Sequence, residues 1–232
     1  MPPAWRAPQC RTGPESSRVA ISDGVAALSS AILHPVSTEP ATTATPLDGR
    51  PLDLDAFAHV KEERLRRLLR HWLECRGGAV APKRAAIDPT AIGPILASIW
   101  LCDYEPADQR FRMRLAGEDI NRLYGRNVTQ CYFEEIIEPP LLPAVLRRYR
   151  RVVAEPAVLH CGGHIYLASN RSEIGERLVL PLCDDSGAIM HVIGASVYRM
   201  DLKLGDGPIM RESVTETFTP LAVAADGSVA DA

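Results

Sequence analysis

Two stretches of the chain place apolar residues at helical spacing. Over residues 54–76 the apolar positions recur every three or four residues, and basic side chains occupy much of the remaining surface. Residues 140–153 repeat this pattern, with arginines opposite the apolar side. We therefore predict two amphipathic helices, the first of which ends at Gly77 and Gly78.

A different period marks the middle of the chain. Between Arg110 and Leu115, apolar side chains alternate strictly with arginines, which is typical of a strand that is buried on one face. The pattern breaks at Gly117, where acidic residues open a short helix over residues 119–124. Residues 97–103 are apolar and precede a turn, so we expect them to form a β-hairpin with this strand.

Three further strands are predicted at residues 157–166, 176–183 and 188–200, the last two joined by a tight turn. Strands in consecutive hairpins, with helices inserted between the two groups, fit a single antiparallel sheet. The predicted fold class is therefore α+β: a five-stranded antiparallel sheet covered on one face by short helices and preceded by the amphipathic N-terminal helix. Residues 54–200 make up this domain, and we expect residues 1–53 and 201–232 to be disordered.

Amino-acid composition and charge argue against several classes of protein. The chain has 232 residues, of which 46% are hydrophobic and 24% charged, and its formal net charge is -3. These values are typical of a soluble globular protein and argue against nucleic acid as the main partner. No stretch reaches the ~18 apolar residues of a membrane span, and the apolar run at 19–36 is too interrupted for a secretory leader, so we expect a cytoplasmic protein. The 6 cysteines form no C-x-x-C pair and are expected to be free thiols.

The most reactive group of side chains is His160, Cys161 and His164, which two glycines separate. A turn at these glycines could bring both histidines and the thiol around a metal ion, with His191 as a further ligand. Strand histidines are more often packing residues, however, and no third group is recognised that would orient a histidine base beside a Cys161 nucleophile. We therefore assign no metal site and no catalytic residue, and expect the protein not to be an enzyme.

Several short motifs occur in a defined order. Arg84-Ala-Ala-Ile-Asp-Pro precedes the first strand, the strand at 111–117 leads into Tyr124-Gly-Arg-Asn-Val-Thr129, and Leu178-Val-Leu-Pro-Leu182 runs towards Gly187. Over residues 65–200 this order resembles the PAS fold, and more closely the PAS-like family found in alphaproteobacterial proteins. One departure is Gln130, at a position where the family usually has glycine.

The resemblance implies a single-domain sensor or regulatory protein of bacterial signalling, which binds a small ligand between sheet and helices, a protein partner, or both. The expected partners are a second copy of the chain and an unidentified signalling protein, and no cofactor is identified. A ligand-free interaction or dimerisation module is the alternative, and nucleic-acid binding through the arginine-rich helix faces is a weaker one. Candidate ligand-binding residues, each of which core packing would equally explain, are Met113, Leu115, Leu123, Tyr124, Tyr132, Phe133, Tyr149, Tyr166 and His191.

Overall fold

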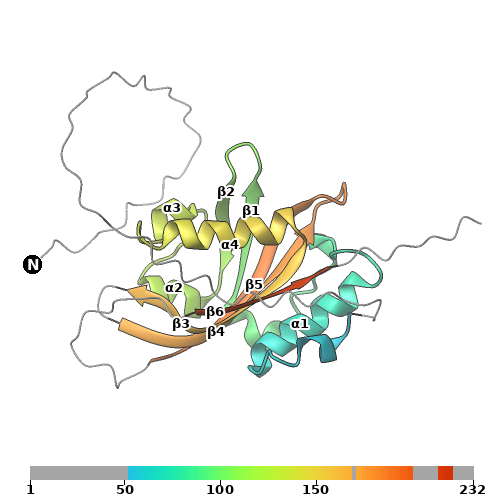
Figure 1. The fold of residues 1–232 in the computed structure, drawn as a ribbon, viewed down its shortest axis with the longest axis horizontal. Helices are drawn as coiled ribbons and strands as arrows, with labels where there is room; N and C mark the ends of the chain where they lie inside the picture. Colours follow the sequence, from blue (N-terminus) through green and yellow to red (C-terminus); the bar gives the residue numbers. More distant parts are fainter. Residues whose placement is uncertain (1–51, 169–170, 201–213, 222–232) are drawn as a thin grey trace, which may run out of the picture.

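The computed structural model describes residues 52–168, 171–200 and 214–221, which form one sheet with helices on both of its faces (Figure 1). The sheet has six strands in the order β2-β1-β5-β4-β3-β6, and each strand is antiparallel to its neighbours. The strands are β1 (Ile99–Glu105), β2 (Arg110–Ala116), β3 (Ala157–Ala168), β4 (Arg171–Cys183), β5 (Ile189–Met200) and β6 (Val214–Pro220). The predicted hairpins correspond to β1–β2 and β4–β5.

Strand β6 corrects the prediction of a five-stranded sheet and of an unstructured segment after residue 200. It pairs with β3 from Ala157 to Gly163. Two contacts join it to α4 (Leu142–Ala154): Arg148 and Glu216 form a buried ion pair at 2.5 Å, and the Arg151 guanidinium lies 4.2 Å from the centre of the Phe218 ring. Because one of the buried positions of β6 is a glutamate, the strand carries no clear apolar alternation in the sequence.

Helices α2 (Glu118–Tyr124), α3 (Phe133–Ile136) and α4 cover one face of the sheet, which we call the inner face. Helix α4 turns Val145, Leu146, Tyr149 and Val152 towards this face. This spacing buries one side of the helix and leaves arginines such as Arg147 exposed on the other. An apolar cluster shared by the sheet and three helices therefore lies on the inner face.

The opposite face, here the outer face, carries a second apolar cluster under α1 (Glu63–Arg76). Leu65, Leu68, Leu69 and Trp72 of α1 are 0% exposed, and the Trp72 indole N–H donates to the Pro181 carbonyl at 2.9 Å. The predicted helix over 54–76 begins only at Glu63, because residues 54–57 form the separate 3-10 turn η1 (Leu54–Phe57). Two further 3-10 turns, η2 (Arg84–Ala86) and η3 (Gly93–Ser98), connect α1 to β1. Helices thus cover both faces of the sheet, with the short helices on the inner face and the amphipathic helix α1 on the outer face.

The loop at Gln130 covers part of the β2 edge. The Gln130 N–H donates to the Met113 carbonyl at 2.6 Å, and the Met113 N–H donates to the Cys131 carbonyl at 2.8 Å. Gln130 has a φ of 70°, in the left-handed region that glycine adopts most easily. The backbone therefore takes a conformation suited to glycine even though the chain has glutamine there. None of the described helices has the length and apolar character that a bilayer-spanning segment requires.

Candidate functional site

The candidate ligand residues divide between the two faces of the sheet. Met113, Phe133 and Tyr149 are buried on the inner face, and Tyr124 packs against the same cluster from the end of α2. Leu123 also lies on α2, but it is only partly buried and belongs to neither apolar cluster. The structure thus gathers the first four of these residues around one interior region.

Aromatic rings fill the inner face near the β1–β2 hairpin. Tyr104 contacts Phe111, which stacks on Phe133 at a centroid distance of 5.4 Å, and Phe133 meets Tyr149 edge-on at 4.9 Å. Tyr149 in turn lies 5.6 Å from Trp100. Ring pairs at these distances and angles are favourable beyond the apolar area they bury. This end of the interior is therefore closely packed, and the Trp100 indole connects it to polar groups on β4 and β5.

A buried arginine is the main polar feature of the inner face. Arg177 of β4 is 7% exposed, its Nε donates to the Ser196 hydroxyl at 3.1 Å, and its Nη2 donates to the Tyr198 hydroxyl at 3.3 Å. The Trp100 indole N–H donates to the same Ser196 oxygen at 2.9 Å, and the guanidinium carbon is 5.9 Å from the centre of the Trp100 ring. Because a guanidinium does not lose its proton in proteins, Arg177 is a permanent positive charge inside the fold.

Burial and this charge have opposite effects on the acidic groups nearby. Burial raises the pKa of Tyr124, Tyr149 and Cys102, and the positive charge of Arg177 offsets only part of each rise. Burial also disfavours the charged form of Arg177, but the neighbouring tyrosines keep its pKa above the ordinary value. At neutral pH Tyr124, Tyr149 and Cys102 are therefore uncharged and can donate hydrogen bonds. Such a site can bind a carboxylate, which accepts two hydrogen bonds from a guanidinium.

Leu115 does not lie with Met113 on the inner face, contrary to the strict alternation of the sequence. Met113 pairs with Cys102 and Leu115 with Leu101, so Arg114 is an extra residue that forms a β-bulge. A bulge reverses the facing of every residue after it, and Leu115 is 44% exposed beside Leu101 on the outer side. A pattern within one strand cannot show a bulge that depends on the partner strand.

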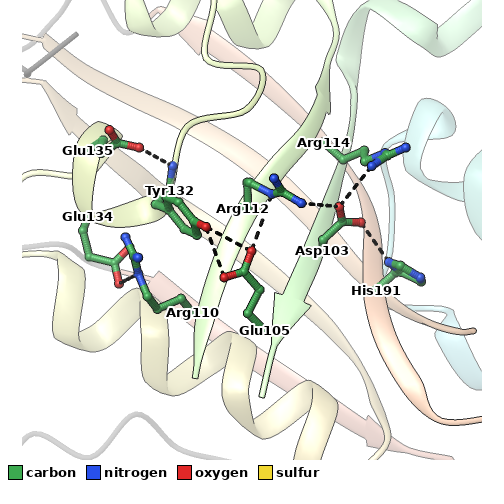
Figure 2. Close-up of polar contacts among 9 residues, drawn as sticks. All are labelled: Asp103, Glu105, Arg110, Arg112, Arg114, Tyr132, Glu134, Glu135 and His191. Carbon is green, nitrogen blue, oxygen red and sulfur yellow. Dashed lines mark hydrogen bonds and ion pairs between the residues drawn. The ribbon is translucent and has the colours of Figure 1, made fainter. Parts of the chain in front are cut away.

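Tyr132 and His191 belong to a charged surface on the outer side of the β1–β2 hairpin, which Figure 2 shows and which we call the outer strip. Asp103 Oδ1 accepts a hydrogen bond from His191 Nδ1 at 2.9 Å, and the Asp103 carboxylate forms ion pairs with Arg112 and Arg114, each at 3.6 Å. The outer strip comprises Asp103, Glu105, Arg110, Arg112, Arg114, Tyr132, Glu134 and His191.

Ionisation in the outer strip follows from these contacts. Partial burial of Asp103 opposes its charge, but the hydrogen bond to His191 and the arginine charges outweigh burial and lower the pKa of Asp103. Burial and the hydrogen bond that the Tyr132 hydroxyl donates to Glu105 raise the pKa of Tyr132. The Arg110 guanidinium lies 3.6 Å from the centre of the Tyr132 ring. Tyr132 and His191 are thus held by charged neighbours, away from the inner face.

His160 and Cys161, the two described members of the group that includes His164, point to opposite faces of the sheet. His160 points to the outer face, where its Nε2 lies 3.1 Å from Glu176 Oε2, and the adjacent Cys161 is buried on the inner face. Neighbouring strand residues point to opposite faces, and residues 162–163 continue β3 instead of forming a turn. The side chains of His164 and Tyr166 lie outside the described residues. Among the described residues, no group of three or more His, Cys, Asp or Glu side chains could hold a metal ion.

The site residues that the sequence analysis missed are Arg177, Ser196, Tyr198 and Trp100. Arginine is mostly an exposed residue. An arginine at the start of an apolar strand therefore suggests that the buried segment of the strand begins only after it. One signal was present: counting in twos from the buried Val179 places Arg177 on the same face. A charged residue at an inward position of a strand that is buried on both faces therefore indicates a polar interior site.

An antiparallel sheet with three helices on its inner face and a polar group inside defines an α+β module. A model of the PAS domain family matches residues 60–197, more than half of the chain, and the chain belongs to this family. PAS domains are generally sensory and regulatory modules of signalling proteins. Among solved structures, the PAS domain of Bordetella pertussis BvgS is similar at 19% sequence identity with a TM-score of 0.39, and the match covers 50% of this chain and 90% of that one. No curated protein matches the chain.

Proposed function

We propose that this PAS domain is a non-enzymatic sensor or regulatory module that binds a small organic acid on its inner face, beside Arg177. The observation that supports this function is the buried guanidinium with its hydroxyl partners Ser196 and Tyr198. In a site of low dielectric constant, a positive charge attracts an anion more strongly than it does in water. The Trp100 and Tyr149 rings next to it favour an acid with an aromatic or aliphatic body.

A thermal-shift screen tests this function. Benzoate, phenylacetate and hexanoate are compared with their uncharged amides, at concentrations up to about 100 times the dissociation constant. A ligand at that excess stabilises the fold by about 2.7 kcal/mol. For a domain of this size, that corresponds to a rise in Tm of about 5–10 °C. A carboxylate that raises the Tm while its amide does not supports the proposal.

Two matched variants assign the effect to the site. Arg177→Met removes the buried guanidinium and replaces it with an apolar side chain of similar length, and it should abolish the carboxylate shift. Arg147→Met makes the same chemical change at an exposed position of α4 and should leave the shift intact. A carboxylate shift of equal size in the Arg177→Met protein contradicts the proposed site, and no shift with any ligand contradicts the sensing function.

The alternative function is a ligand-free module that forms a homodimer through the outer strip. The closely packed aromatic end of the inner face and the exposed Leu115 favour this function. In a two-fold contact, the arginines of β2 in one copy would face Asp103 and Glu105 of β1 in the other. Light scattering after size exclusion would then give a dimer mass, which Arg112→Glu lowers to the monomer value and Arg147→Glu does not. A monomer at all concentrations contradicts this alternative.

A further inference from the structure

The segment that precedes α1 is held on the outer face by residues on either side of one histidine. Phe57 and Val60 are 0% exposed and belong to the apolar cluster that includes Val158 of β3 and Leu178 of β4. His59 lies between them in the chain, and its ring meets the ring of His160 edge-on at a centroid distance of 5.2 Å. We call residues 52–60 the N-terminal cap.

Next to His160, one ring nitrogen of His59 has no hydrogen-bond partner among the described residues. This nitrogen, Nε2, is buried. His160 is 9% exposed, and its Nε2 lies 3.1 Å from Glu176 Oε2. A buried nitrogen without a partner is tolerated far better when the ring is neutral than when it is charged. The docked cap therefore favours a neutral His59.

We propose that the N-terminal cap is released from the outer face under acidic conditions, when His59 and His160 take up protons. The groups that face His59 are His160 on β3, Glu176 on β4 and Lys61 on its own segment. Strand β6 places the neutral Thr217 opposite His160. Among the described residues, Glu176 is the one group that opposes the repulsion between two imidazolium rings, and it already contacts His160. Release uncovers the apolar sheet surface beneath Phe57 and Val60.

The pKa shifts of the two histidines agree with this direction. Burial lowers the pKa of His59, and the neighbouring His160 and Lys61 lower it further. Burial also lowers the pKa of His160, although Glu176 acts in the opposite sense. Since both values are lowered in the docked state, the released cap binds more protons. Docking is therefore complete above the ordinary histidine pKa of about 6.5 and weakens as the pH falls below it.

Hydrogen exchange of the full chain, corrected for the intrinsic rate at each pH, tests the release. We expect the protection of a peptide covering residues 52–60 to fall more than about threefold between pH 7.5 and 5.5. Linkage sets the upper limit of this change, because each additional bound proton alters the docking equilibrium by at most about tenfold per pH unit. A peptide covering residues 178–182, in the centre of β4, should keep its protection. Protection of the cap that does not change with pH overturns the proposal.

Variants assign the response to the two rings. The double variant His59→Gln with His160→Gln should have the same cap protection at both pH values, while His71→Gln, which changes a partly exposed histidine of α1, should keep the full response. A fall that persists in the double variant overturns the proposal. If the double variant lacks a docked cap even at pH 7.5, His59→Phe provides an uncharged ring, and a full response in that variant also overturns it.

Discussion

Replacing Glu216 by alanine removes the carboxylate that faces Arg148 and tests whether β6 is docked on the domain. The two side chains are 10% and 5% exposed, so water screens their charges only weakly. Removing one member of an ion pair at this depth typically costs about 3–5 kcal/mol, because the remaining charge stays buried. For a domain of this size, the expected fall in Tm is roughly 6–20 °C.

Urea unfolding followed by circular dichroism measures the loss for Glu216→Ala. The matched control is Glu155→Ala, because Glu155 forms an ion pair with Arg151 at 3.2 Å but is 72% exposed, and this change should cost less than about 0.5 kcal/mol. Replacing both buried partners, with Arg148→Met and Glu216→Leu, should recover most of the stability. A loss below about 1 kcal/mol for Glu216→Ala would show that β6 is not held by this pair, and the reasoning would be wrong.

Two further predictions concern backbone positions. Gln130→Gly should raise the free energy of unfolding by about 0.5–1 kcal/mol, because glycine adopts a φ of 70° without the penalty of a side chain; a loss of stability in a urea titration contradicts this. Gly194→Ala should cost about 3 kcal/mol, because its Cβ would lie 2.2 Å from the Trp100 ring and 2.4 Å from the Leu178 carbonyl. Gly162→Ala, whose Cβ meets nothing nearer than 3.9 Å, is its control and should change stability by less than about 1 kcal/mol; equal losses would contradict the packing of Trp100 on Gly194.

Most helices and strands could be predicted from the sequence, because the spacing of apolar residues within each of them shows which face is buried. Strand β2 and helix α4 are examples, since apolar residues alternate in one and recur at helical spacing in the other. Strand β6 could not be predicted this way, because its buried Glu216 depends on Arg148, which lies 68 residues earlier in the chain. The bulge at Arg114 is equally hidden, since it is defined only by pairing with β1.

The site was less predictable than the fold. Strand alternation placed Met113 and helical spacing placed Tyr149 on an apolar side, and both are buried on the inner face. Phe133, which the sequence offered only as a loop aromatic, is buried there as well. The aromatic or basic character of a residue does not indicate, however, which face of the sheet it lies on. Tyr132 and His191 lie in the outer strip, where they contact charged residues that only the folded chain brings together (Figure 2). Arg177 was missed because a buried charge depends on hydroxyl partners from a neighbouring strand.

The most direct test of the account is a crystal structure of the protein with the carboxylate that raises its Tm most in the screen. We predict that both carboxylate oxygens accept hydrogen bonds from the Arg177 guanidinium at about 2.7–2.9 Å, with the body of the ligand against the Trp100 and Tyr149 rings. A ligand bound only on the outer strip, or an inner face in which protein side chains surround Arg177 completely at saturating ligand, would contradict the proposed sensing site.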